Sequence, residues 1–193
     1  MRIFWLYAHP CPESFHGSIR ARAVAAAERA GHVVDMCDLV AEGFDPVMRA
    51  EERRRYHDLS RNQQGLEGWI ERINLAEWLV CQFPVWCFGP PALLKGFFDR
   101  IFLPGVAFDL SKPADVTSKF NRLNRVTGIA SYGQDRLKAF WMGDPPRKLI
   151  TRYLAWYAGR GARVRYLPVY RMNTIDQDQR ERFIRQVERH FER

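Results

Sequence analysis

Short runs of apolar residues alternate along this chain with longer segments in which apolar residues recur at helical spacing. The runs have the length of strands, and the longer segments can form helices. The predicted strands cover residues 2–8, 33–37, 78–83, 125–130 and 164–169. The predicted helices cover residues 14–30, 48–56, 63–74, 91–102, 146–160 and 176–191. The last helix has the clearest pattern, with Phe183, Val187 and Phe191 at four-residue intervals on one face.

Strands that alternate with helices predict an α/β fold. Right-handed crossovers then give a parallel sheet with helices on both faces. For five strands the simplest arrangement is a flavodoxin-like, doubly wound sheet of order 2-1-3-4-5. No repeat, low-complexity tract or linker interrupts the pattern, so we expect a single domain over residues 1–193. Residues 103–124 form the longest stretch with little regular pattern, and such loops are often functional.

The charge balance of the chain is basic. It has 193 residues, and 30 Lys and Arg against 22 Asp and Glu give a net charge of +8. Much of the excess lies in residues 49–56 and in the last helix, as expected of a solvated surface. A basic surface also attracts anionic ligands, such as a nucleotide phosphate, or an acidic partner. No zinc finger, helix-turn-helix or interleaved basic and aromatic stripe is present, so we expect no nucleic-acid partner.

The chain has neither a predicted membrane span nor a metal motif. No apolar run approaches the length needed to cross a bilayer. The apolar stretch before His9 is too short for a signal peptide, so we expect a cytoplasmic protein. The four cysteines, Cys11, Cys37, Cys81 and Cys87, lack C-x-x-C spacing. We therefore expect four reduced thiols and no metal site.

Residues 79–108, LVCQFPVWCFGPPALLKGFFDRIFLPGVAF, are the most informative segment. An apolar run forms the third strand, and Pro84 is expected to end it because proline has no N–H for a sheet ladder. Pro90 and Pro91 fit the first turn of the following helix. Trp86 and Phe88 lie between, beyond the carboxyl end of the strand, where ligands bind in open parallel sheets. Large flat side chains there favour a flat aromatic ligand.

A second candidate segment, AHPCPESFHGS over residues 8–18, directly follows the first strand. Ser14 is a good helix N-cap, and the first turn of a helix exposes backbone N–H groups that can bind phosphate. Capping and packing alone would also explain Ser14 and Phe15. The chain lacks G-x-G-x-x-G and G-x-x-x-x-G-K-[ST], so neither a dinucleotide-binding fold of the usual type nor a nucleotide triphosphatase is predicted.

The third candidate segment follows the fourth strand and contains Ser131, Tyr132, Gly133 and Gln134. A glycine lets the backbone approach a ligand closely. Tyr132 and Gln134 can donate hydrogen bonds to the polar edge of a ring, and Tyr132 is the candidate catalytic residue. In the order 2-1-3-4-5 the first, third and fourth strands are adjacent, so all three segments converge on one crevice. A phosphate site beside a flat aromatic slot predicts bound flavin mononucleotide (FMN).

The segments that follow the first and third strands also carry a resemblance. The chain resembles the flavodoxin-like NAD(P)H:quinone oxidoreductases, a family that includes small ancillary proteins of potassium-efflux antiporters. The resemblance rests on AHPCPESFHGS and on QFPVWCFGPPALLKGFFDRIFLPGVAF, and it extends from residue 2 to about residue 170. It implies that the flavin phosphate is held by Ser14, Phe15 and His16, with His9 nearby. It implies that the isoalloxazine ring lies against Pro84, Val85, Trp86, Cys87 and Phe88. It implies that the ring's polar edge is held by Ser131, Tyr132, Gly133 and Gln134.

The chain departs from the family pattern at several positions. Many members have Thr-Thr-Gly-Gly where Ala130, Ser131, Tyr132 and Gly133 stand, and many have asparagine in place of His16. The mammalian enzymes use a tyrosine and a histidine in a longer loop after the fourth strand as a proton relay, and no histidine follows Tyr132 in that loop here. Their C-terminal extension is also absent, which favours FMN over FAD.

The resemblance implies a flavoenzyme that transfers a hydride from NAD(P)H through the flavin to a quinone or similar acceptor, and that forms a homodimer. The aromatic loop and residues 103–123 are the candidate contact surfaces. The alternative is a regulatory subunit that binds flavin or nucleotide and gates a potassium-efflux antiporter, for which a basic surface suits a membrane-associated partner. An electron-transfer flavodoxin is disfavoured, because flavodoxins are usually acidic.

Overall fold

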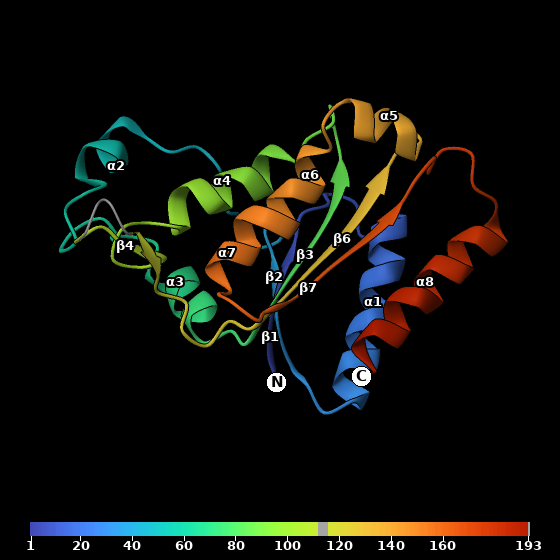
Figure 1. The fold of residues 1–193 in the computed structure, drawn as a ribbon, viewed down its shortest axis with the longest axis horizontal. Coiled ribbons are helices and arrows are strands. Elements are labelled where there is room, and N and C mark those ends of the chain that lie inside the picture. Colours follow the sequence, from blue (N-terminus) through green and yellow to red (C-terminus); the bar gives the residue numbers. More distant parts are fainter. Residues whose placement is uncertain (112–115, 193) are drawn as a thin grey trace.

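Five strands form the parallel sheet that organises the molecule (Figure 1). The computed structural model describes residues 1–111 and 116–192, and its main sheet has the order β2-β1-β3-β6-β7. The strands are β1 (Arg2–Tyr7), β2 (Val33–Asp38), β3 (Trp78–Val85), β6 (Arg125–Tyr132) and β7 (Arg163–Val169). All neighbouring pairs are parallel. Since β6 and β7 are the fourth and fifth strands of this sheet, the predicted flavodoxin-like order is confirmed.

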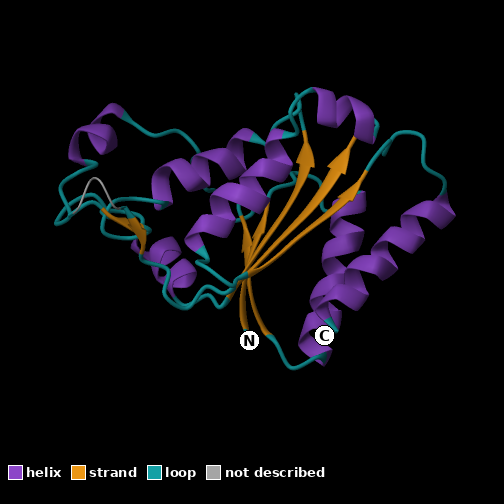
Figure 2. Ribbon diagram, viewed as in Figure 1, coloured by secondary structure: helices purple, strands orange, loops and turns teal. Residues whose placement is uncertain are grey.

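Helices cover both faces of the sheet (Figure 2). On one face lie α1 (Phe15–Arg29) and α8 (Gln177–Phe191), and on the other lie α3 (Glu67–Asn74) and α4 (Ala92–Ile101). The remaining elements are α2 (Ala50–Arg55), β4 (Phe108–Asp109), β5 (Thr117–Ser118), α5 (Arg136–Trp141), α6 (Pro145–Lys148), the π-helical segment η1 (Leu149–Leu154) and α7 (Ala155–Tyr157). Each face of the sheet therefore has its own apolar layer.

Strand alternation divides the core into these two layers, because successive side chains point to opposite faces. In β3, Leu79, Cys81 and Phe83 pack in the layer beneath α3 and α4. Trp78 and Val80 pack on the α1 and α8 side. All five side chains are buried, which explains why β3 carries apolar residues on both of its faces rather than alternately apolar and polar ones.

Two strands extend farther than the sequence predicts. Pro84 does not end β3, which continues to Val85 in register with β6, where Val85 pairs with Tyr132. The proline is tolerated because β1 ends opposite Gln82, so that side of β3 needs no further N–H donor. Strand β6 likewise continues through Ser131 to Tyr132, so these two residues belong to a strand and not to the loop after it.

Several helices also differ from the prediction. Both prolines of the Pro90–Pro91 pair precede α4, whose first residue is Ala92. The predicted helix over residues 146–160 contains a π-helical turn, and α5 was not predicted. The stretch over residues 103–124 contains the short antiparallel pair β4–β5, with residues 112–115 outside the described part. Short elements such as these are formed by local capping and packing rather than by a periodic apolar stripe.

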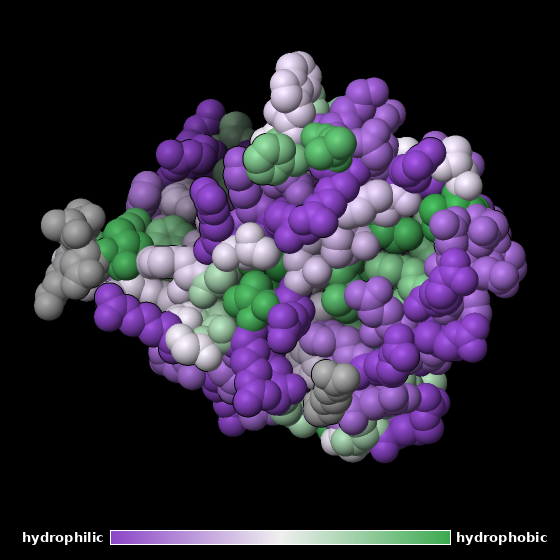
Figure 3. Space-filling view, turned by 45° about the vertical axis from the view of Figure 1, so that its right-hand side comes forward, coloured by the Kyte–Doolittle hydropathy of each residue, from purple (hydrophilic) through white to green (hydrophobic). Residues whose placement is uncertain are grey.

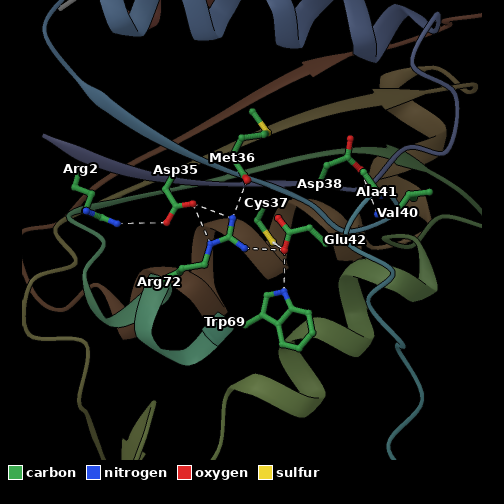
Figure 4. A network of polar contacts seen from close by, with 10 residues as sticks. All are labelled: Arg2, Asp35, Met36, Cys37, Asp38, Val40, Ala41, Glu42, Trp69 and Arg72. Carbon is green, nitrogen blue, oxygen red and sulfur yellow. Dashed lines mark hydrogen bonds and ion pairs between the residues drawn. The ribbon is translucent and has the colours of Figure 1, made fainter. Parts of the chain in front are cut away.

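A polar network anchors α3 to the edge strand β2 (Figure 4). Arg72 on α3 donates to the Asp35 carboxylate at 3.0 Å, to the Glu42 carboxylate at 2.7 Å and to the Met36 carbonyl at 2.7 Å. The Trp69 indole N–H donates to the same Glu42 carboxylate at 3.0 Å. One guanidinium thus bridges two carboxylates and a strand carbonyl, which fixes α3 against β2.

All four cysteines are free: Cys37 and Cys81 are buried in strands, and Cys11 and Cys87 are exposed in loops. Within residues 1–111 and 116–192, no helix combines the length and the apolar character that a membrane span requires. The same residues contain no group of three or more His, Cys, Asp or Glu side chains arranged to hold a metal ion.

Candidate functional site

The carboxyl ends of β1, β3 and β6 lie side by side at one edge of the sheet (Figure 1). The three segments singled out from the sequence begin at these ends. They therefore meet at one edge, as a doubly wound sheet requires at the point where its strand order reverses. Hydrophobic side chains also stand out at this upper end of the molecule in Figure 3.

The loop after β1 is held tightly against the first turn of α1. Ser14 is the N-cap of α1, and its hydroxyl accepts a hydrogen bond from the Gly17 N–H at 3.2 Å, so the predicted cap is confirmed. A Cβ atom on Gly17 would lie 1.8 Å from the Pro12 carbonyl oxygen. The first turn of α1 contains no acidic residue. Its positive dipole end is therefore not neutralised by a side chain of that turn, as suits an anion site.

His16 does not face the solvent beside this loop but lies buried beneath it. Its Nε2 atom is 2.8 Å from the Ser131 hydroxyl, and its carbonyl accepts a hydrogen bond from the Gln82 amide at 2.7 Å. The other end of that amide accepts from the Trp5 indole at 3.0 Å. This chain of contacts joins β1, β3, α1 and β6. His16 and Ser131 thus hold together the elements that carry the site.

The environment of His16 keeps its imidazole neutral. Burial lowers the pKa of His16 to about 3, and the neighbouring His9 ring adds to the effect. His9 stacks on His16 with ring centroids 5.5 Å apart and contacts Trp86 with centroids 6.3 Å apart. His9 therefore links the loop after β1 to the aromatic loop after β3. Burial also lowers the pKa of His9.

The aromatic loop is a tight two-residue turn under backbone strain. Trp86 and Gly89 exchange both backbone hydrogen bonds, at 2.8 and 3.1 Å, across Cys87 and Phe88. The two central residues have φ angles of +49° and +57°. Positive φ at both positions is the pattern of a type I′ turn, in which Asn and Gly are the usual residues. A Cys–Phe pair there stores strain, which is typical of functional sites.

A pocket of about 380 Å³ lies between the ends of β3 and β6. It is lined by Val85, Trp86, Cys87, Phe88, Tyr132, Gly133 and Gln134. Trp86 is half-exposed at this edge, whereas Tyr132 is buried. Seven residues that were assigned to the ring site from the sequence thus line one hollow, which we call the aromatic slot. Pro84 lies one residue before it in β3 and is not among the lining residues.

The Tyr132 hydroxyl, expected to donate a hydrogen bond to a ligand, is instead bonded within the protein. It donates a hydrogen bond to the Asp144 carboxylate at 2.6 Å and also contacts the Tyr166 hydroxyl. Burial, with Tyr166 and Asp144 beside it, raises the pKa of Tyr132 well above its usual range. The aromatic ring of Tyr132 forms a wall of the slot, but its proton is held by Asp144. Ser131 points to the opposite face, toward His16, because strand side chains alternate.

Gly133 and Gln134 lie just beyond β6 and are exposed. A Cβ on Gly133 would meet only ordinary contact, 3.5 Å from the Asn173 amide, so the fold itself does not demand glycine there. The Gln134 side chain accepts a long hydrogen bond from Lys138 at 3.4 Å. Phe15 packs on Phe183 with ring centroids 6.1 Å apart. Its side chain belongs to the core, and only its backbone is available to an anion.

The sequence did not assign roles to several residues of this edge. Gln82 sits in the middle of the His16 network, and Asp144 holds Tyr132. Asp144 has a φ of +44°, directly before two prolines. The Asp–Pro–Pro–Arg run is the feature of the sequence that could have indicated an unusual backbone at Asp144, since the residue before a proline rarely adopts helical geometry.

Comparisons with known proteins agree with this fold. A family model described as "Flavodoxin-like fold" matches residues 1–191. Ribosyldihydronicotinamide dehydrogenase (quinone) of Homo sapiens is 32% identical over 127 residues, covering 56% of this chain and 54% of that protein. The uncharacterized NAD(P)H oxidoreductase YcaK of Escherichia coli is 30% identical over 156 residues, covering 79% and 74%. The chain thus spans about half the length of the quinone dehydrogenases that it matches.

Solved structures are similar over the whole chain. Smu.1420 from Streptococcus mutans superposes with a TM-score of 0.88 at 26% identity, covering 100% of this chain and 99% of that one. The NAD(P)H:quinone oxidoreductase from Methanothermobacter marburgensis gives a TM-score of 0.80 at 22% identity, covering 100% and 98%. At that identity the second likeness is evidence of a common fold alone.

Proposed function

The chain belongs to the flavodoxin-like family whose members include NAD(P)H dehydrogenases (quinone), and from this premise we propose that it is an FMN-dependent NAD(P)H:quinone oxidoreductase. The observation that carries the proposal is the aromatic slot at the carboxyl edge of the sheet, beside the N-terminus of α1. A flat ring with a phosphate-bearing tail needs these two features side by side.

The residues present fit FMN at both ends. The close approach of Gly17 to Pro12 keeps the loop after β1 compact around the start of α1. Backbone N–H groups of Phe15 and His16 in this first turn would hold the phosphate. The strained turn at Cys87 and Phe88 would present a rigid apolar wall to the ring, with Tyr132 opposite. A wall that is already formed saves the entropy of ordering it on binding.

When bound, FMN would supply the redox chemistry, taking a hydride from NAD(P)H and returning the electrons to a quinone. The chain's own contribution is to bind, to orient and to exclude water. Trp86 is half-exposed at 49%, and its position at the rim of the slot would cover one edge of the ring. Gly133 and Gln134 would lie along the ring's polar edge, with backbone N–H groups as donors. Tyr132 would contribute its ring as a wall and not its hydroxyl as an acid, since that proton is bonded to Asp144.

We also propose that the protein acts as a cytoplasmic homodimer. Large apolar side chains are exposed near the site, among them Trp86 at 49%, Leu137 at 81% and Trp141 at 82%. Exposed apolar area of this kind is typical of an interface. Of the contact surfaces expected from the sequence, part of residues 103–123 lies outside the described residues. Light scattering coupled to size-exclusion chromatography tests this, because a homodimer has twice the mass of the single chain.

A paired substitution tests the proposed flavin site. Trp86→Ala removes a side chain that lines the slot, whereas Trp156→Ala removes one of similar exposure on α7, outside it. We expect Trp86→Ala to weaken FMN binding by about tenfold or more, as the loss of a stacking aromatic does, with little change in unfolding. Trp156→Ala should bind FMN like the parent. Equal FMN affinity in both variants, measured by flavin fluorescence, would contradict the assignment of the slot.

A further inference from the structure

A second hollow adjoins the aromatic slot on the side of α5. It has a volume of about 480 Å³ and lies between α5 and the segment formed by α6 and η1. The side chains important to its chemistry are Arg136, Phe140, Asp144, Arg147, Lys148 and Arg152. We call it the basic hollow. Tyr132 separates it from the slot, since its ring lines the slot and its hydroxyl bonds to Asp144 in the basic hollow.

We propose that the basic hollow binds the phosphorylated adenosine half of NADPH and makes the protein prefer NADPH to NADH. This inference rests on the proposed function, because it concerns the electron donor of that reaction. The side chains of the hollow would distinguish the two nucleotides, which differ only in the phosphate on the adenosine 2′-oxygen.

The charge of the hollow is the first reason. Among the described residues, Arg136, Lys148 and Arg152 make neither an ion pair nor a side-chain hydrogen bond, although all three line the same space. Like charges held together without counter-charges favour binding of an anion. Guanidinium groups in particular match phosphate oxygens in a fork geometry.

The carboxylate in the hollow does not oppose an anion. Both oxygens of Asp144 are already engaged, one by the Tyr132 hydroxyl at 2.6 Å and the other by Arg147 at 3.1 Å. Asp144 is also buried. It neutralises Arg147 and leaves the other three cations of the hollow uncompensated.

Phe140 supplies the second reason. Its side chain is 78% exposed although it is a large aromatic ring, and it lines the basic hollow. An exposed aromatic face beside uncompensated cations suits a nucleotide base with its phosphates, because every base has a flat face that stacks on such a ring. A purely inorganic anion would make no use of Phe140.

Position gives the third reason. Gln134 lines the slot and Arg136, two residues later, lines the hollow. A dinucleotide with its nicotinamide over the flavin ring at the mouth of the slot would therefore extend its phosphates along α5. Three free cations exceed the two charges of the pyrophosphate that NADH and NADPH share, and the excess fits the additional phosphate.

The test uses the FMN-loaded protein and two nucleotides that differ only in the 2′-phosphate. Calorimetry compares adenosine 2′,5′-bisphosphate with adenosine 5′-monophosphate. We expect the bisphosphate to bind about tenfold or more tightly, as charge-assisted hydrogen bonds to a phosphate imply. The double variant Arg136→Ala, Arg152→Ala should lose this preference. Both residues are exposed, so the variant should fold normally.

A matched control is Arg163→Ala, which removes an exposed arginine that also lacks an ion pair among the described residues. Arg163 pairs with Arg125 at the start of β6, about 23 Å along the strand from Tyr132 at 3.3 Å per residue. The control should keep the preference for the bisphosphate. An equal loss in Arg163→Ala would mean a general effect of net charge and would overturn the proposal.

Kinetics give the second readout. In the double variant we expect kcat/KM for NADPH to fall about tenfold or more. That for NADH should fall by a smaller factor, because NADH lacks the 2′-phosphate, so the preference for NADPH is lost. Equal use of both nucleotides by the parent protein, or a change confined to the KM of the quinone, would refute the inference. If the parent oxidises neither nucleotide, the proposed function fails, and binding of the bisphosphate still reports separately on the basic hollow.

Discussion

Among the glycines at the candidate site, Gly17 is the one where an added methyl group should displace the backbone most. In Gly17→Ala the new Cβ would meet the Pro12 carbonyl oxygen at 1.8 Å and the Pro12 carbonyl carbon at 2.9 Å. Real Cβ contacts are at least 3.0 Å, and both opposing atoms are backbone, so no side chain can rotate away. The loop after β1 or the start of α1 has to move.

The size of the effect follows from two opposing terms. Alanine is the better helix former by about 1 kcal/mol in a helix interior. An overpacked contact costs about 1–3 kcal/mol, and a backbone contact this short belongs at the upper end. We therefore expect Gly17→Ala to reduce the free energy of unfolding by about 1–2 kcal/mol after both terms are counted. Movement of the loop should also weaken FMN binding.

Gly68→Ala is the matched control. Gly68 also lies in a helix, α3, and a Cβ there meets nothing within 4 Å. This variant should gain up to about 1 kcal/mol and bind FMN unchanged. Urea denaturation and flavin fluorescence quenching give the two quantities. The reasoning is refuted if Gly17→Ala is stabilised as Gly68→Ala is, or if it binds FMN as tightly as the parent.

Three other predictions concern stability. The pKa of His16 is about 3 in the folded protein and near 6.5 in the unfolded chain, so its contribution to stability is full above pH 6.5 and is lost as the pH falls toward 3. Relative to His16→Asn, the parent should lose about 2 kcal/mol of its free energy of unfolding between pH 6.5 and pH 5. Parallel plots of the free energy of unfolding against pH for the two proteins would disprove this. Arg72→Ala should cost about 1–3 kcal/mol, because Asp35 would keep, among the described residues, only its longer ion pair with Arg2 at 3.6 Å, and Glu42 would keep the Trp69 indole N–H but lose the guanidinium. Arg49→Ala, in a more exposed pair, should cost under about 1 kcal/mol, and similar values for the two variants by urea titration would count against the network. Cys87→Gly should be more stable than Cys87→Ala by about 1 kcal/mol, since glycine adopts positive φ without strain, and the reverse order would exclude strain in the turn.

The sequence predicted the sheet and the N-cap of α1 well. Ser14 was identified as a cap because a serine before a helical pattern has one common function, and strand order followed from the alternation of elements. The same reasoning brought the three loops to one edge. These features depend on local chemistry and general topology, which a single sequence contains.

Side-chain direction was harder to predict. Extending β6 by two residues sent Ser131 to one face and Tyr132 to the other, so two neighbours expected to share a ligand became parts of separate networks. His16 was expected to hold the phosphate, but its side chain is buried. The sequence could not indicate this, because its partners Gln82 and Ser131 are distant along the chain. Helix α5 gave no signal, since its large apolar residues are exposed and form no buried stripe.

The most direct test of the central claim is an anaerobic absorption titration of the purified protein after incubation with FMN and removal of the unbound flavin. The account predicts a yellow protein with one FMN per chain, whose visible absorption bleaches on addition of NADPH and returns when a quinone is added. A colourless protein, or a bound flavin that neither nucleotide reduces, would contradict it.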